Sequence, residues 1–340
     1  MLTVWAPDGV GEVHEGDDLA DLLLQALASS VVSTGSSGGP ALADGDVVCV
    51  TSKVVSKAEG RVEVGDRAEA VVRETVRLVA QRGQLSVVVN RLGLTMAAAG
   101  VDASNVEPGT LVLLPDDPDA SARRLRAALD ERAGVEVAVV VTDTAGRAWR
   151  EGQTDIVIGA AGLRVLDDHS GRTDPYGNEL AVTAPAVADE IAGAAELVAG
   201  KLGRRPFTVV RGRADLVLPS GDDGPGAAAL LREPGADLFG LGSREAVLAA
   251  LGARPEQRAS YGAPVAAGDL ARVLAALLPD AEVSDGAEDG AEDGPDDGPR
   301  VTVTADDARA CWAAEVAAWA HGFEVTLREP RRVRFRPSTP

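Results

Sequence analysis

The stretch Val137-Ala-Val-Val-Val-Thr-Asp-Thr-Ala-Gly-Arg-Ala-Trp-Arg150 places a carboxylate, two hydroxyls and two arginines directly after an apolar run. An apolar run of this length predicts a buried strand. Where the strand ends, Asp143 and Thr144 would offer hard oxygen ligands to a divalent metal, and Arg147 and Arg150 would offer forked donors to phosphate oxygens. The alternative is a strand that ends in an Asx-type turn with surface arginines. The segment on its own does not separate these two interpretations.

Strands and helices alternate along the chain on both sides of this stretch. Apolar runs predict strands over residues 2–5, 46–51, 86–89, 111–114, 156–165 and 207–211. Helical spacing of apolar residues predicts helices over residues 17–29, 67–81, 119–132 and 187–202. Because strands and helices are intermingled, the expected fold class is α+β (mixed α/β).

The composition changes in the last third of the chain. Helical patterns over residues 245–252 and 267–278 precede an acidic stretch, residues 285–299, in which Gly-Ala-Glu-Asp occurs twice in tandem. Such a stretch cannot bury a core, so we expect it to be disordered. A strand and a helix are expected within residues 302–323, and a basic strand and tail over 328–336. The predicted organisation is a domain at 1–245, a helical segment at 246–279, an acidic disordered linker at 280–300 and a small C-terminal αβ segment at 301–340.

The overall charge limits the kind of partner. The formal net charge of −20 repels the phosphate backbone, so no nucleic-acid partner is expected. An acidic protein that binds anionic phosphates would need a metal ion to bridge them. Aromatic residues make up only 3% of the chain, so the core must be built from Ala, Val and Leu.

The sequence shows no signal for export or membrane insertion, so a cytoplasmic protein is expected. Cys49 and Cys311 lie far apart in unlike contexts, which indicates neither a disulfide framework nor a metal spacing. The N-terminal residues lack the basic and apolar regions of a signal peptide. No apolar run reaches the roughly 18 residues needed to span a bilayer, so no membrane partner is expected.

Two common nucleotide-binding signatures are absent. The chain contains no G-x-x-x-x-G-K-[ST] phosphate loop and no G-x-G-x-x-G after a first strand. Its three histidines, His14, His169 and His321, are not at metal spacing, which makes zinc chemistry improbable. Any nucleotide must therefore bind to a different scaffold.

Three further segments carry candidate site residues, each with a structural alternative. Ser52 and Lys57 follow a predicted strand, where a lysine can neutralise a phosphate; the alternative is an exposed connector. Asp102 can ligate Mg²⁺ or Mn²⁺ and Asn105 can contact a base or ribose, but their spacing also fits an Asx-turn or a helix N-cap. Tyr176, in the turn Asp174-Pro-Tyr-Gly-Asn-Glu179, could stack on a ring ligand or belong only to the turn.

Seven sequence blocks occur in an order that resembles one known family, the coenzyme F420-0:L-glutamate ligases, which are the γ-glutamyl ligases of deazaflavin coenzyme biosynthesis. Any one block would be a weak signal, whereas the ordered set is specific and covers about residues 3 to 242. The blocks are VCVTSKVVSKAEG at 48–60, NRLGL at 90–94, AGVDASNV at 99–106, TDTAGRAWREGQ at 142–153, DPYGNEL at 174–180, VADEIA at 187–192 and VVRG at 209–212.

The resemblance implies a reaction and a set of roles. GTP would phosphorylate the terminal carboxylate of the coenzyme precursor F420-0, and the amine of L-glutamate would displace phosphate from the acyl phosphate, with further γ-linked glutamates added afterwards. The cofactor would be Mg²⁺ or Mn²⁺, K⁺ is a further expected ion, and the protein would be a homodimer. The implied metal ligands are Asp102, Asp143 and Thr144, the implied nucleotide contacts are Val10, Gly11, Glu12, Val13, Ser52, Lys57 and Asn105, and Arg147 and Arg150 join Asp143 as catalytic candidates on charge and position alone.

The sequence is most similar to the actinobacterial form of the family, in which the ligase is fused to a nitroreductase-like flavin domain. The segment 246–279 looks like a helical remnant of that domain, so neither flavin binding nor a second activity is expected. Two departures from the family pattern stand out. The N-terminal loop has Gly9-Val10-Gly11 where the family usually has a proline, and residues 213–220 intervene before the loop Gly221-Asp-Asp-Gly224.

Two other functions fit the same residues. One is a non-catalytic deazaflavin- or nucleotide-binding homologue that keeps the fold. The other is an amide ligase of the same scaffold that acts on a different acid. Glutamate addition to the precursor would separate the ligase from the binding protein, and a panel of acids would separate the two ligases.

Overall fold

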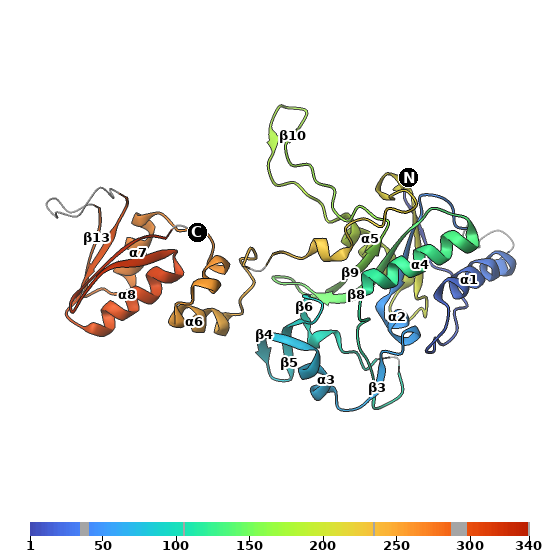
Figure 1. Ribbon diagram of the computed structural model, residues 1–340, viewed down its shortest axis with the longest axis horizontal. Helices are drawn as coiled ribbons and strands as arrows, with labels where there is room; N and C mark the ends of the chain where they lie inside the picture. The colour runs from blue at the N-terminus through green and yellow to red at the C-terminus, as the bar shows by residue number, and fades with distance from the viewer. Residues whose placement is uncertain (35–40, 105, 234, 287–297, 339–340) are drawn as a thin grey trace. The chain divides into compact units, whose positions relative to one another are not determined.

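The computed structural model describes the whole chain except residues 35–40, 105, 234, 287–297 and 339–340 (Figure 1). The chain divides into two compact units, unit 1 over Met1–Leu231 and unit 2 over Arg232–Pro340. Strands and helices alternate through both units, which confirms the predicted mixed α+β class. None of the described helices is long and apolar enough to cross a membrane.

Unit 1 is built around a five-stranded sheet. Its strand order is β1 (Thr3–Trp5), β12 (Phe207–Arg211), β2 (Val47–Thr51), β8 (Ala138–Gly146) and β9 (Gln153–Ala161). The central strands β2 and β8 run parallel, whereas the other neighbouring strands run antiparallel. Both central strands therefore end at the same edge of the sheet, which is where they can share a site.

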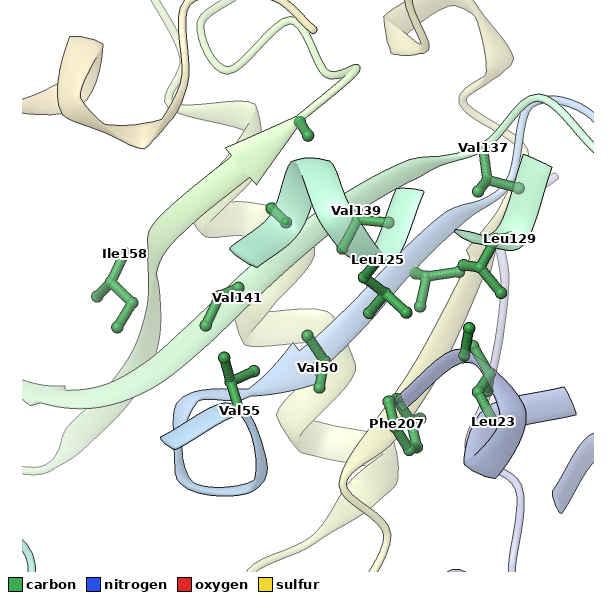
Figure 2. Close-up of a cluster of buried hydrophobic side chains, with 14 of the residues drawn as sticks. Leu23, Val50, Val55, Leu125, Leu129, Val137, Val139, Val141, Ile158 and Phe207 are labelled. Carbon is green, nitrogen blue, oxygen red and sulfur yellow. The ribbon is translucent and has the colours of Figure 1, made fainter. Parts of the chain in front are cut away.

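Helices cover both faces of this sheet, so the central strands are apolar on both sides. Helices α1 (Leu19–Thr34) and α4 (Pro118–Ala133) pack on one face, where Leu23 and Leu129 are fully buried against Val139 and Phe207 (Figure 2). Helix α5 (Val187–Ala199) covers the other face with small side chains. Alternate residues of β2 and β8 serve the two cores, since successive strand side chains point to opposite faces.

Local signals explain where α4 begins and ends. Pro118 occupies its first turn, and the side chain of Asp117 accepts a hydrogen bond from the N–H of Ala120. Gly134 ends the helix in the left-handed conformation, at φ +65°, which glycine adopts without a steric penalty. This helix agrees with the one predicted over 119–132.

A second group of elements in unit 1 forms a small lobe between β2 and β8 in sequence (teal and blue in Figure 1). Ala70, Val88, Ala99 and Leu111 contribute to its core. The lobe contains α2 (Ser52–Ala58), β3 (Val62–Val64) paired with β7 (Thr110–Val112), α3 (Arg67–Glu74), the sheet of β4 (Thr75–Arg82), β5 (Leu85–Asn90) and β6 (Thr95–Ala97), and the 3-10 turn η1 (Ala98–Gly100).

The helix predicted over residues 67–81 is wrong in its second half. Asp66 caps the helix at its start, but the helix ends at Glu74 and strand β4 follows at once. The β-branched residues Thr75 and Val76 favour extended backbone, and antiparallel pairing with β5 supplies the hydrogen bonds of the new strand. The helical spacing of apolar residues therefore led to a wrong prediction here, because these residues form a strand whose partner, β5, lies later in the sequence.

The remaining elements of unit 1 lie in its later connections. A short hairpin joins β10 (Arg172–Thr173) to β11 (Glu179–Leu180), and the 3-10 turns η2 (Ala214–Leu216) and η3 (Ala227–Leu230) follow β12. In the hairpin, Asp174 Oδ1 accepts hydrogen bonds from the N–H groups of Tyr176 and Asn178, both at 2.8 Å. The structure thus shows the Asx-type turn at this position.

Unit 2 has a four-stranded antiparallel sheet with its own core. Leu270 and Leu274 are fully buried there against Val303 and Phe335. The sheet order is β13 (Glu282–Asp285), β14 (Val301–Thr304), β16 (Arg332–Pro337) and β15 (Phe323–Glu329), and the helical elements are α6 (Ser243–Gly252), η4 (Pro255–Tyr261), α7 (Ala267–Leu277) and α8 (Ala308–Ala320).

The C-terminal segments lie together in unit 2. The structure divides the chain after Leu231, before the expected boundary at 245, and α7 packs with β14 and β16 in one core. Segments 246–279 and 301–340 therefore belong to one unit. Within the expected linker at 280–300, Glu282–Asp285 form strand β13, which pairs antiparallel with β14. The acidic residues 287–297 lie outside the described part of the chain.

Candidate active site

A cavity of about 1450 Å³ lies at the edge of the sheet where β2 and β8 end. Its walls come from the N-terminal loop, the start of α2, the turn that precedes Asp102, the end of β8 and the connection between α5 and β12. All of these segments belong to unit 1. The predicted site residues that line it are Val10, Gly11, Glu12, Val13, Ser52, Lys57, Asp102, Asp143 and Thr144.

The parallel register of β2 and β8 brings Ser52 to Asp143. Thr51 is the register partner of Thr142, so the next residue of each strand emerges at the same point of the sheet edge. Ser52 Oγ donates a hydrogen bond to Asp143 Oδ1 at 2.7 Å. Ser52 is also the first residue of α2, so the strand end and the helix start hold the carboxylate together.

Asp143 lies in an unfavourable environment for a negative charge. Burial is the largest of the influences that raise the pKa of its carboxyl to about 6. The neighbouring carboxylates of Asp155 and Asp102 act in the same direction as burial, whereas the hydrogen bond from Ser52 lowers the pKa. Three carboxylates close enough to repel one another, with a hydroxyl beside them, form a set of oxygen atoms that a cation would stabilise.

Asp102 is fixed by its backbone as well as by its side chain. Its N–H and C=O both bond to Val112 in an isolated bridge, at 3.0 and 2.8 Å. Lys53 Nζ lies 2.6 Å from Asp102 Oδ2, and Ser104 donates to the same carboxylate from its N–H and its hydroxyl. Burial raises the pKa of Asp102, but the bonds from Lys53 and Ser104 outweigh it and lower the pKa overall.

Thr144 is positioned by the next strand of the sheet. It is the cross-strand partner of Asp155 on β9, and its Oγ1 donates to Asp155 Oδ1 at 2.9 Å. Asp155 itself is 5% exposed. The hydroxyl hydrogen of Thr144 is thus held by Asp155, which leaves lone pairs of the Thr144 oxygen for another ligand.

The N-terminal loop and α2 form a further part of the cavity wall. Lys57 of α2 forms an ion pair with Glu12 of the loop, and the hydrogen bond from Lys57 is the largest of the influences that lower the pKa of Glu12. Val13 is buried and anchors the loop, while Gly9 has φ +90°, a conformation open to glycine. Gly9 therefore allows the backbone to turn just before the residues that line the cavity.

The oxygen donors of this cavity fit a hard divalent cation that also binds phosphate. Two carboxylates and a hydroxyl, from Asp102, Asp143 and Thr144, match the partial protein ligand set that Mg²⁺ takes when substrate phosphates and waters complete its shell. Within the described residues, no three His, Cys, Asp or Glu side chains lie close enough to hold a metal by themselves. Asp102, Asp143 and Thr144 would leave coordination positions of such a cation to other ligands.

The candidate residues Arg147, Arg150 and Tyr176 do not line the cavity. Arg147 and Arg150 lie in the exposed hairpin between β8 and β9, where Arg147 Nη2 donates to the carbonyl of Glu151 at 2.9 Å. Asn105 lies outside the described residues. The exposed Tyr176 is likewise absent from the cavity wall.

The loop after β12, which departs from the family pattern, packs against a different part of unit 1. Arg126 of α4 is 7% exposed and donates to the carbonyls of Leu218, Pro219 and Asp222 and to the carboxylate of Asp223. These contacts fix the loop beside α4, and its residues do not line the cavity. Arg126 therefore holds residues 218–223 in place.

Sequence reasoning missed several residues that line the cavity. Asp155 carried a signal, since it is a lone acid in the apolar strand β9 and faces Thr144 across the sheet. Nothing in the sequence distinguishes Lys53 from Lys57, because only the folded position of Asp102 shows which lysine pairs with it. Glu196, in the last turn of α5, and Lys201 and Arg204, in the connection from α5 to β12, carried no local signal because the helix looks like an ordinary amphipathic one.

Comparison with known proteins identifies the family of the chain. The family model for F420-0:Gamma-glutamyl ligase matches residues 9–66 and 63–212. The chain is 37% identical to a coenzyme F420:L-glutamate ligase of Methanopyrus kandleri, over 67% of this chain and 93% of that protein. It is 42% identical to the Natronomonas pharaonis protein of the same name, over 58% and 80%, and 39% identical to that of Archaeoglobus fulgidus, over 62% and 88%. The chain belongs to the F420-0:gamma-glutamyl ligase family.

Proposed function

We propose that this protein is an acid–amino-acid ligase that adds L-glutamate to the deazaflavin precursor F420-0, and then further γ-linked glutamates, with GTP and Mg²⁺ or Mn²⁺. The observation that carries the proposal is the pairing of Ser52 with Asp143 at the ends of two parallel strands. That pairing sets oxygen donors beside the wall that carries Lys57. The names of the relatives supply the substrates.

The proposed chemistry is a phosphoryl transfer followed by an acyl transfer. A carboxylate oxygen of the acceptor bonds to the γ-phosphorus of GTP as the bond to GDP breaks, which gives an acyl phosphate. The glutamate nitrogen then bonds to the carbonyl carbon, inorganic phosphate leaves, and the amine proton passes to solvent. Joining anions in this way depends mainly on alignment and on charge neutralisation.

The residues of the cavity divide these tasks between them. Asp102, Asp143 and Thr144 would hold the divalent cation, which when bound offsets the charge of the nucleotide phosphates. Ser52 orients Asp143, and Lys57 offers a positive charge to a phosphate once Glu12 releases it. Val10, Gly11, Val13 and Asn105 are the other proposed nucleotide contacts, K⁺ is a further proposed ion, and Arg147 and Arg150 stay proposed on charge alone.

A single assay separates this proposal from its rivals. Purified protein is incubated with F420-0, L-glutamate, GTP and Mn²⁺, and the products are analysed by mass spectrometry. The proposal expects the mass of one or more glutamyl residues to be added, and expects the gain to vanish when either GTP or the metal is omitted. Binding of F420-0 without a mass gain would indicate the non-catalytic homologue. A gain only on other acids would indicate a ligase of different substrate.

We further propose that unit 1 forms a homodimer. Supporting this, Val72, Val76 and Leu78 of α3 and β4 are 74%, 70% and 50% exposed, which is unusual for a cluster of large aliphatic side chains on neighbouring elements. Light scattering coupled to size exclusion should give twice the chain mass. A mass of one chain at micromolar concentration would contradict this proposal.

A further inference from the structure

The chain has only three lysines, and all three line the cavity. Two of them are neutralised by carboxylates, since Lys53 pairs with Asp102 and Lys57 pairs with Glu12. Lys201 differs from both. Among the described residues it forms no ion pair, and its Nζ lies 3.5 Å from Thr144 Oγ1, at the end of β8.

Local structure explains how Lys201 reaches this point. Helix α5 ends at Ala199, and Gly200 ends it with φ +66°. The chain then follows the cavity wall from Lys201 to Pro206 before β12 begins at Phe207. The end of a helix packed on the sheet therefore delivers a flexible ammonium to the edge of the sheet where β8 ends.

The charges around Lys201 leave its ammonium available to an anion. Burial raises the pKa of Glu196, and so does the charge of Asp155, whereas Lys201 acts in the opposite direction. Lys201 and Glu196 are nevertheless not joined as an ion pair within the described structure. Arg204, on the same connection, also lines the cavity without an ion pair to any described residue. Lys201 and Arg204 thus bring positive charge to the cavity that Asp143 and Asp155 also line.

The proposed reaction requires such a charge. An acceptor carboxylate must approach a triphosphate, and both are anions, so a cation on the acceptor side lowers their repulsion. Lys57 lies on the wall formed by α2 and the N-terminal loop, whereas Lys201 lies beside Thr144. The two lysines can therefore serve the two different anions.

We propose that Lys201 is a further catalytic residue, which binds the terminal carboxylate of the acceptor and then the same oxygens in the acyl phosphate. This inference rests on the proposed function and deepens it. Lys201 forms and breaks no covalent bond, and its ammonium stabilises negative charge where the carboxylate oxygen bonds to phosphorus. An ammonium suits this task because it acts as a compact point charge that can follow a moving oxygen.

The test uses Lys201→Met, which removes the charge but keeps the length of the side chain, and Lys201→Arg, which keeps the charge. Arg123→Met on α4 is the matched control, since Arg123 is an exposed cation outside this cavity. For each protein the experiment measures kcat and KM for F420-0, Kd for a fluorescent GTP analogue and the melting temperature. A purely structural role would change stability or nucleotide affinity together with turnover.

We expect kcat/KM for F420-0 to fall about 100-fold in Lys201→Met, the loss typical of removing one preorganised charge-stabilising donor. Lys201→Arg should recover most of that loss, and Arg123→Met should match the unchanged protein. GTP affinity and melting temperature should stay unchanged in all three variants. A loss under threefold in Lys201→Met, or a loss explained by weaker GTP binding, would overturn the role of Lys201 while the proposed function stands. Absence of glutamate addition by the unchanged protein would overturn both.

Discussion

Ser52 and Asp143 lie 91 residues apart in the sequence, yet Ser52 Oγ donates to Asp143 Oδ1 at 2.7 Å. The contact follows from the parallel register of β2 and β8, because each residue comes directly after the paired threonines Thr51 and Thr142. One hydrogen bond thus connects the strand predicted to carry the metal ligand with α2, whose residues Ser52 and Lys57 are predicted nucleotide contacts. The proposed site depends on this junction.

Replacement of Ser52 by alanine should impair glutamate addition without unfolding the protein. The Asp143 carboxylate loses its hydroxyl donor, and hydrogen bonds to charged groups are worth about 1.5–3 kcal/mol, so turnover should fall at least tenfold. Ser56→Ala is the control, because Ser56 is buried on the same helix and its hydroxyl has no partner in the described structure. Steady-state kinetics of both variants decide the matter, and equal activity of the two would argue against the role of Ser52.

Removal of Asp155 should weaken metal binding through Thr144. In Asp155→Ala the hydroxyl of Thr144 loses its acceptor, and loss of such an outer contact costs about 10- to 100-fold in metal affinity. Asp155→Asn keeps an acceptor oxygen and should retain more affinity than the alanine variant. Titration of Mn²⁺ by electron paramagnetic resonance in the presence of GTP measures this directly. Unchanged affinity in Asp155→Ala would show that Thr144 does not depend on Asp155.

Asp189 should show a pH-dependent effect on stability. Its Oδ1 accepts a hydrogen bond from the N–H of Val157 at 2.8 Å, and burial raises the pKa of its carboxyl. A carboxyl whose pKa is higher in the folded state contributes most below its unfolded pKa, and the contribution is lost as pH rises through the folded pKa. Asp189→Asn keeps the acceptor without the charge, so its stability relative to the unchanged protein should improve as the pH rises from about 4 to about 7.

The matched variant for this prediction is Asp189→Ala. It removes the same titrating carboxyl and also leaves the N–H of Val157 without its acceptor, so it should be about 1 kcal/mol less stable than Asp189→Asn at every pH. Urea unfolding at several pH values measures both variants. A stability difference between Asp189→Asn and the unchanged protein that does not vary with pH would contradict the assigned cause.

Damage to the core of unit 2 should leave the active site unaffected. Leu274 is fully buried among residues of unit 2 alone, so Leu274→Ala should destabilise that unit by about 2–5 kcal/mol. Hydrogen–deuterium exchange should increase across 267–277 and 301–304 but not at β8. Val273→Ala, at a neighbouring position that is 39% exposed, is the control. Loss of glutamate addition in Leu274→Ala would indicate that catalysis depends on unit 2.

Much of the site could be predicted because its residues follow strands that are apolar enough to recognise. The run before Asp143 and the run before Ser52 each indicate a buried strand, and a carboxylate or hydroxyl at the end of such a strand is visible in the sequence. Local sequence therefore suffices to predict an oxygen-rich strand end at Thr142-Asp143-Thr144. It does not predict which strand lies beside that end, since register is a long-range property.

Other features of the fold and the site could not be predicted from local sequence, because they depend on contacts between distant segments. Residues 75–82 have helical spacing, but they form β4 because β5 supplies their hydrogen bonds. Lys201 follows a helix with nothing nearby to suggest a site, and only the packing of α5 on the sheet brings it to Thr144. Likewise, the acidic composition of residues 280–300 predicts a linker, but it does not indicate that Glu282–Asp285 pair with β14 as a strand.

The central claim is that Asp143 lies at the centre of a glutamate-adding site, and one comparison tests it most directly. The unchanged protein and Asp143→Ala are first shown to have the same melting temperature. Each is then incubated with F420-0, L-glutamate, GTP and Mn²⁺, and the mass of the coenzyme product is measured by mass spectrometry. We predict that the unchanged protein adds the mass of glutamyl residues and that the folded Asp143→Ala variant adds none. Equal addition by the two proteins, or no addition by the unchanged protein, would contradict this claim.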